Sequence, residues 1–222
     1  MDARPGHAYR APTSSDSRSP CPALNAAANH GYLPHDGKNL SLLQLTKAVH
    51  TLYNLTWPLA FMLALGGILL CGNKFRLTVD LAALDQHGKV EHDASLVHQD
   101  KRDGDYVHPN KVLLEELVAQ SSDGRGLTLE DFAKARLRRQ ARIPGGKLDR
   151  LHSKFAGGES VLAVQVVGDG NEIGVEHVKE WFGGEKLPHG WMPNGHMGII
   201  TLGRENRKFG KMIEEAKKSE KL

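Results

Sequence analysis

Apolar residues recur along most of this chain at three- and four-residue spacing, the period of an amphipathic helix. The stretch LLQLTKAVHTLYN at 42–54 shows the pattern clearly, directly after a serine suited to cap a helix. Further helices are predicted at 21–31, 110–121, 128–142, 147–170, 174–184 and 204–218. No internal repeat is visible, and few stretches alternate in the way that strands do. The pattern predicts one mostly α-helical domain.

The longest uncharged stretch is LTWPLAFMLALGGILLCG at residues 55–72. It just reaches the lower limit of about 18 residues for a membrane-spanning helix. Pro58 near its start, the pair Gly66-Gly67 and the lack of a flanking basic cluster argue against a span. We interpret it as a buried core helix and expect no membrane span.

The two ends of the chain differ from its middle. Residues 1–18 are rich in Ser, Pro and Arg, which predicts an extended N-terminal segment ahead of a folded domain at 19–222. No apolar signal sequence is visible, so the chain is either cytoplasmic or a mature secreted form. Asn39-Leu40-Ser41 and Asn54-Leu55-Thr56 match the N-glycosylation motif and favour secretion, although a cytoplasmic location stays open.

Charge gives little indication of a partner. The 29 Lys and Arg residues exceed the 26 Asp and Glu residues by three. The excess gathers in KARLRRQAR at 134–142 and in RKFGKMIEEAKKSEKL at 207–222. Neither run carries aromatic platforms or a nucleic-acid motif. We therefore interpret both as solvated helix faces and expect no nucleic-acid partner.

Cys21 and Cys71 are the only cysteines, too few for a disulfide framework. Cys21 lies between two prolines at the predicted start of a helix, where backbone N–H groups and the helix dipole favour a thiolate. We therefore expect the pKa of its thiol to fall. Such a thiolate suits nucleophilic attack, redox chemistry or metal ligation, and a structural or disulfide-bonded role stays equally open.

Two later stretches carry carboxylates suited to metal binding or to acid–base catalysis. VEHDASLVHQD places oxygen ligands for a hard divalent cation at alternate positions, on Glu91, Asp93 and Ser95. His92 lies among them and suits acid–base work, while a solvated acidic turn is the alternative. In FAGGESVLAVQVV, Glu159 precedes an apolar run, and a buried carboxylate is either paired or raised in pKa. Helix capping is the alternative there.

Four stretches together match, in order, motifs of the fungal haem-thiolate peroxidases, the family of chloroperoxidase and the unspecific peroxygenases. They are SPCPALNAAANHGYLPHDGKNLS at 19–41, EHDAS at 91–95, FAGGESVLAVQVV at 155–167 and WFGGEKLPHGW at 181–191. The chain resembles this family from about residue 18 to 191, and its length is similar to the short type of peroxygenase. The resemblance implies a helical chloroperoxidase-like fold that encloses a haem.

The resemblance also implies roles for individual residues. Cys21 is expected to be the axial thiolate of haem b, and Glu159 the acid–base residue that moves a proton of hydrogen peroxide. Phe155 stands where the longer relatives have an arginine, so His92 is the expected partner of Glu159, as in the short type. Phe155 is then expected to line the substrate channel.

A second ion is part of the same expectation. In relatives, Mg²⁺ at a haem propionate is held by residues that correspond to Glu91, Ser95 and the backbone carbonyl of His92. Cys71 is expected to be a lone buried thiol or an intermolecular bridge, because a bond to Cys21 would abolish haem ligation. A homodimer stays open.

The activity implied is insertion of one oxygen atom from hydrogen peroxide into small apolar or aromatic substrates. Hydroxylation or epoxidation would proceed through an oxo-iron(IV) porphyrin radical, with one-electron peroxidase activity beside it. Chloroperoxidase-like halide oxidation is the first alternative, because it uses the same species. A non-haem metal-dependent hydrolase built on Glu91, His92 and Glu159 is more distant, since the paired-histidine spacing of zinc hydrolases is absent.

Overall fold

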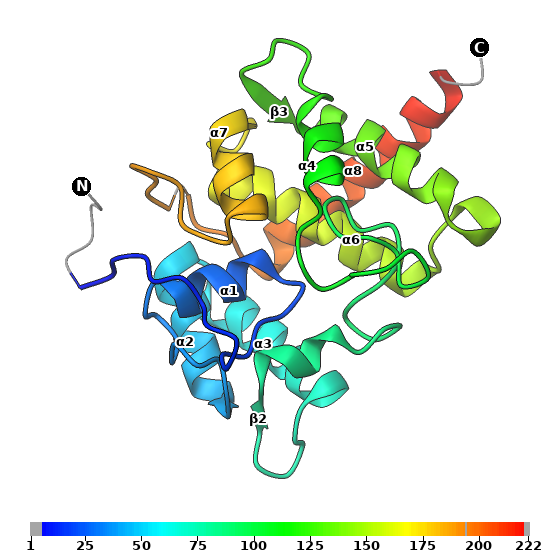
Figure 1. The fold of residues 1–222 in the computed structure, drawn as a ribbon. Helices are drawn as coiled ribbons and strands as arrows, with labels where there is room; N and C mark the ends of the chain where they lie inside the picture. Colours follow the sequence, from blue (N-terminus) through cyan, green and yellow to red (C-terminus); the bar gives the residue numbers. More distant parts are fainter. Residues whose placement is uncertain (1–5, 194, 220–222) are drawn as a thin grey trace.

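Helices account for about 53% of the structure, a computed structural model that describes residues 6–193 and 195–219 (Figure 1). They are α1 (Pro22–Asn29), α2 (Leu42–Tyr53), α3 (Trp57–Cys71), α4 (Lys111–Val118), α5 (Leu129–Arg142), α6 (Arg150–Leu162), α7 (Val175–Val178) and α8 (Ile199–Ser219). The 3-10 turns η1 (Leu81–Asp85) and η2 (Pro144–Gly146) and the π-helical turns η3 (Ala163–Val167) and η4 (Lys179–Gly183) accompany them. The predicted helical fold is confirmed, although α8 begins earlier than expected.

Two short antiparallel ribbons are the only sheets among the described residues. In the first, β1 (Leu40–Ser41) pairs with β2 (Thr78–Val79). In the second, β3 (Gly126–Thr128) pairs with β4 (Glu172–Gly174), and Leu127 lies opposite Ile173. The second ribbon ties the chain just before α5 to the chain just after η3, so it helps to hold α5 and α6 in register.

The apolar run at 55–72 forms α3, which packs against α2. Its inward positions, which include Leu59 and Ile68, are fully buried, whereas Phe61 and Leu70 on other sides stay exposed. In the part of the chain that the structure describes, no helix combines the length and the apolar character needed to cross a bilayer. The interpretation as a core helix therefore holds for one side of α3.

Capping boxes begin two of the helices. Ser41 accepts a hydrogen bond from the backbone N–H of Gln44, and the Gln44 side chain accepts one from the backbone N–H of Ser41. Thr128 and Asp131 exchange the same pair of bonds at the start of α5. Because a capping box fixes where a helix begins, it also fixes which side chains of α5 face inward. One of these is Arg136, which is 1% exposed.

Residues 6–20 run along α1 without regular secondary structure of their own (Figure 1). Within 6–18 the chain is tied down at Arg18, whose guanidinium donates to Oδ1 of Asn29 at 2.6 and 3.0 Å. Residues 1–5 of the predicted N-terminal segment, and 220–222 at the other end, lie outside the described residues. A boundary near residue 18 between segment and domain stays a prediction.

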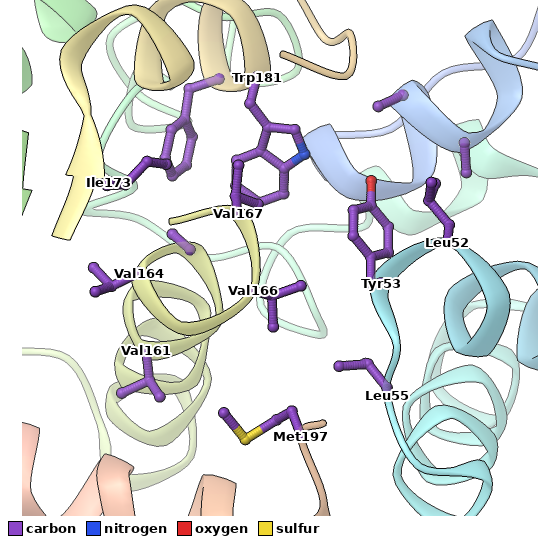
Figure 2. Close-up of a cluster of buried hydrophobic side chains, with 14 of the residues drawn as sticks. Leu52, Tyr53, Leu55, Val161, Val164, Val166, Val167, Ile173, Trp181 and Met197 are labelled. Atoms are coloured by element: carbon purple, nitrogen blue, oxygen red, sulfur yellow. The ribbon is translucent and has the colours of Figure 1, made fainter. Parts of the chain in front are cut away.

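A hydrophobic core joins α2 to α6, η3 and η4 (Figure 2). Figure 2 shows side chains converging from these elements, from β4 and from the loops before α3 and α8: Leu52, Tyr53, Leu55, Val161, Val164, Val166, Val167, Ile173, Trp181 and Met197. Val161 and Val164 are fully buried and follow Glu159 by less than two helical turns. Burial of this run therefore fixes the helix on which that carboxylate is carried.

Candidate functional site

Cys21 is the N-cap residue of α1, with Pro22 in the first helical position. The backbone N–H groups of Ala23 and Leu24, in the first turn, lie near enough to lower the pKa of its thiol, although the side chain makes no capping hydrogen bond. Proline suits this position because the N–H that it lacks would have no intrahelical partner. Cys21 is half-buried, and both it and Cys71 are free thiols. The thiol is thus held at a helix start on a partly accessible residue.

The expected low pKa of this thiol is wrong. Burial raises the pKa of Cys21 to about 11, and the negative charges of Glu159 and Glu185 add to the effect. The N–H groups of Leu24 and Ala23 lower the pKa, as a helix start should, but they are outweighed. A thiol of this kind becomes a thiolate when a cation binds the sulfur. The site therefore suits metal ligation better than it suits a free nucleophile.

Glu159 on α6 is paired with two cationic groups. Nη2 of Arg136 donates to its Oε2 at 3.1 Å, and Nε2 of His92 lies 3.7 Å from the same oxygen. Burial raises the pKa of Glu159, but His92 and Arg136 more than offset this and lower it overall. The carboxylate is thus kept ionised, and its other oxygen, Oε1, accepts no hydrogen bond among the described residues.

Glu159 and Cys21 lie within electrostatic range of each other, and both are partly accessible. The Glu159 side chain keeps 55% of its surface accessible, although burial is the largest influence on its pKa. Half-buried Cys21 shows the same combination, and the charge of Glu159 raises its pKa without a bond between them. The structure therefore brings the thiol and the carboxylate into electrostatic range.

His92 reaches Glu159 from the EHDAS segment. Its Nδ1–H donates to the backbone carbonyl of Asp93 at 2.7 Å, which leaves Nε2 directed at the carboxylate. Burial lowers the pKa of His92, but Glu159 outweighs that effect and raises it. The pair is therefore fully charged between the lowered pKa of Glu159 and the raised pKa of His92. The predicted partnership is present as an ion pair longer than a hydrogen bond.

Arg136 corrects the interpretation of 134–142 as a solvated face. Besides Glu159, its guanidinium donates to the backbone carbonyls of Ala94 at 2.8 Å and Ala156 at 2.9 Å. It thus joins the EHDAS segment to α6 and to the carboxylate. The positive charge is tolerated at 1% exposure because the guanidinium is hydrogen-bonded and paired with a carboxylate.

Arg139, one turn further along α5, is a second buried residue of that basic run, at 6% exposure. Its Nη2 donates to Oδ1 of Asp100 at 2.8 Å, and its Nε donates to the carbonyl of Ser95 at 2.6 Å. A signal for both arginines is present in the sequence. They follow the apolar Phe132 at helical spacing, so they fall on the inward face of α5.

Phe155 lies one turn before Glu159 on α6 and is half-buried. Its ring packs edge-on against His152 at a centroid distance of 6.2 Å, and the His152 ring lies 5.6 Å from that of His92. Phe155 is therefore linked through His152 to the ion-pair cluster. Its role in a substrate channel stays a prediction.

The predicted magnesium ligands lie beside this cluster but do not gather as a preformed cage. Glu91 is 7% exposed; His87 Nδ1 is 2.7 Å from its Oε2, whereas its buried Oε1 has no partner. The Ser95 hydroxyl lies 3.0 Å from Nδ1 of His98. Across 6–193 and 195–219, no group of three or more His, Cys, Asp or Glu side chains is placed to hold a metal ion.

Glu185, from the WFGGEKLP stretch, is a further charged group near Cys21 that the sequence analysis did not single out. Its Oε1 accepts from Nδ2 of Asn25 at 2.6 Å, and its backbone carbonyl accepts from Nδ2 of Asn29 at 2.9 Å. Both asparagines are buried on α1. Burial raises the pKa of Glu185, although the hydrogen bond from Asn25 opposes this. The bonds fix the 181–191 loop against the helix that begins at Cys21.

Comparison with known proteins assigns the chain to a family. The family model described as "Peroxidase, family 2" matches residues 7–196, so the chain belongs to peroxidase family 2, and the resemblance drawn from its motifs is confirmed. It is similar to the chloroperoxidase of Leptoxyphium fumago, with 29% identity over 218 residues that cover 83% of this chain and 57% of that protein.

Two fungal proteins named aromatic peroxygenase are also similar. The one from Cyclocybe aegerita is 32% identical over 133 residues, which cover 52% of this chain and 36% of that protein. The one from Coprinellus radians is 28% identical over 142 residues, with coverage of 56% and 54%. The chain therefore spans between about a third and three fifths of the length of these relatives.

Proposed function

We propose that this chain is a haem-thiolate peroxygenase that uses hydrogen peroxide to hydroxylate or epoxidise small apolar or aromatic substrates, with one-electron peroxidase activity beside it. The observation that carries the proposal is the ionised carboxylate of Glu159, held by His92 and Arg136 within electrostatic range of the Cys21 thiol. Membership in peroxidase family 2 and the names of its relatives support the proposal.

Cys21 and Glu159 fit haem b by their chemistry. Cys21 would hold the iron through its sulfur, and the N–H groups of Ala23 and Leu24 would then moderate the negative charge on that sulfur. Bound haem supplies the iron at which peroxide is activated. Glu159 is accessible and within electrostatic range of the same sulfur, so the chain offers a thiolate ligand and a carboxylate to one bound group.

Glu159 would act as the acid–base residue. Both of its partners contact Oε2, which leaves Oε1 as the oxygen free to accept a proton from hydrogen peroxide. The same oxygen would return that proton to the departing oxygen, so that water leaves. Arg136 and His92 keep the group ionised before the first transfer, because both lower its pKa.

Mg²⁺ is the cation proposed beside the haem. A buried carboxylate oxygen without a partner is costly, and Oε1 of Glu91 is such an atom. A divalent cation at that oxygen would satisfy it, with the Ser95 hydroxyl, the His92 carbonyl and a haem propionate as further ligands. These ligands include only one protein carboxylate, so the site would form together with haem.

The absorption spectrum is the direct test of this proposal. The purified protein, supplied with haem during expression, should show a Soret band that moves strongly to longer wavelength when the iron is reduced under carbon monoxide, because a thiolate ligand from Cys21 would donate charge to the iron. An ordinary haem–carbonyl band would contradict thiolate ligation. A protein without any Soret band would contradict the whole proposal and favour a non-haem metal enzyme.

Arg136→Lys should move the acid limb of the pH–rate profile for peroxide activation upward by about one pH unit. Lysine keeps a charge but not the planar guanidinium that donates to Glu159 and two carbonyls at once, so the pKa of Glu159 should rise towards its ordinary value. Activity would then be lost at a higher pH as pH falls.

Arg139→Lys is the matched control for that variant. Arg139 is also buried on α5 and also clamps the loop after His92, but its carboxylate partner is Asp100. It should lower the thermal midpoint and leave the acid limb where it is. Equal shifts of the acid limb in both variants would show that Arg136 acts through fold stability alone.

Halide oxidation is the second candidate function. It is favoured by one observation, that the relative covering 83% of this chain is named a chloroperoxidase. Chloride-dependent chlorination of an activated carbon acid at low pH, compared with chloride-free hydroxylation of an aromatic ring at neutral pH, separates the two activities. Chlorination that greatly exceeds hydroxylation would make halide oxidation the main activity.

We also propose that the protein acts outside the cell, as the glycosylation triplets favour. Asn39 is exposed on the loop before β1, where a glycan can be attached. Asn54 is engaged instead, since its amide donates to the carbonyl of Gly195 and its Oδ1 lies 3.2 Å from the His196 ring. These contacts make Asn39 the more accessible acceptor.

A further inference from the structure

A cavity of about 280 Å³ lies between α4 and α5, away from Cys21 and Glu159. One water molecule takes about 30 Å³ in the liquid, so this space equals the room of about nine waters. It is smaller than the pockets of drug-sized ligands, which begin near about 300 Å³. Its apolar lining comes from Leu96, Leu113, Leu117 and Ala135. The size suits a ligand of roughly ten heavy atoms.

The polar lining of this cavity is mainly cationic. Arg138, Arg139 and Arg142 line it from α5, against the single carboxylate of Glu116 on α4. Glu116 is already paired, because Nη1 of Arg142 lies 2.8 Å from its Oε2. Arg139 is likewise paired, with Asp100 outside the lining, so the excess positive charge of the cavity rests on Arg138.

Two of these guanidinium groups have N–H donors that form no hydrogen bond with the described residues. Arg138 makes no hydrogen bond or ion pair with the described residues. Arg139 uses Nε and Nη2 for the carbonyl of Ser95 and for Asp100, so its Nη1 has no bond to the described residues. Fixed bonds on one side of Arg139 hold its guanidinium in place. Guanidinium N–H groups at an apolar cavity match a carboxylate, which takes paired hydrogen bonds from them.

We propose that this cavity binds a small carboxylic acid with an apolar body, such as a medium-chain fatty acid. The carboxylate would accept hydrogen bonds from Arg138 and Nη1 of Arg139, and the apolar body would lie on Leu113 and Leu117. The proposal does not rest on haem or on the peroxygenase reaction.

Isothermal titration calorimetry tests the proposal with octanoate, which has ten heavy atoms. Octanoate should bind, whereas acetate, which lacks the apolar body, and octanol, which lacks the charge, should bind at least tenfold more weakly. Equal heats for octanoate and octanol would overturn the assigned role of the arginines. Equal affinities for octanoate and acetate would overturn the role of the leucines.

Two variants locate the site. Arg138→Gln removes a guanidinium that has no partner among the described residues and should weaken octanoate binding about tenfold. Lys134→Gln removes a charge from the same helix outside the cavity and should leave binding unchanged. Ala119→Phe places a ring at the exposed rim of the cavity and should block binding.

Hydrogen exchange adds a readout that needs no substitution. Bound octanoate should slow exchange at the C-terminal ends of α4 and α5, the two segments that border the cavity. Protection confined to α6 around Glu159, or octanoate affinity that is the same in wild type, Arg138→Gln and Ala119→Phe, would place the acid outside this cavity and overturn the proposal.

Discussion

Cys21→Ala should lose the red-shifted carbonyl spectrum and nearly all peroxide-dependent activity. Alanine keeps the start of α1 but removes the only protein atom that we place on the haem iron. Cys71→Ala is the matched control, because Cys71 is the other free thiol and is 8% exposed in the core. It should lower stability by about 1–2 kcal/mol and keep the spectrum. An intact thiolate spectrum in Cys21→Ala would overturn the ligand assignment.

The high pKa of the thiol makes a second part of this prediction measurable without turnover. Because the pKa of Cys21 is raised to about 11, the thiol is protonated at neutral pH and must release its proton when iron binds. The affinity of the wild-type chain for ferric haem should therefore rise up to tenfold per pH unit below that pKa. In Cys21→Ala this dependence should disappear. An equally steep rise in the variant would mean that another group releases the proton.

The sequence predicted those features whose causes are local. The helices came from apolar spacing, and the start of α5 came from the capping pair of Thr128 and Asp131, because such signals act within one or two turns. The proline after Cys21 likewise marked the start of α1. The partnership of Glu159 with His92 came from family resemblance alone, and the structure brings the two side chains to 3.7 Å.

The errors arose where distant segments meet. Arg136 looked like part of a solvated run, and only the packing of α5 on α6 and on the EHDAS segment shows it bound to Glu159. The pKa of Cys21 was expected to fall because a helix start acts locally on the sulfur. Burial and two remote carboxylates, Glu159 and Glu185, reverse that direction. Neither effect can be computed from the residues next to the cysteine in sequence.

Glu159→Gln should keep the haem-thiolate spectrum and lower the rate of peroxide activation by about 100-fold or more. Glutamine preserves the size of the side chain and can still accept from Arg136 through its amide oxygen, but it cannot take a proton at the position of Oε1. Glu130→Gln, an exposed carboxylate in the first turn of α5, is the control and should leave the rate unchanged. Stopped-flow mixing of the ferric protein with peroxide measures the step directly.

The pH dependence of peroxide activation shows whether Glu159 itself is the base that titrates. In the wild type the pKa of Glu159 is lowered from its ordinary value of 4.5 by His92 and Arg136, against the effect of burial. Activity should therefore persist below pH 4.5 and fall as pH drops through the lowered pKa, and in Glu159→Gln this acid limb should be absent. If Glu159→Gln kept both the rate and the acid limb, His92 would be the base instead. The acid limb would then follow the raised pKa of His92, and His92→Asn would abolish that limb.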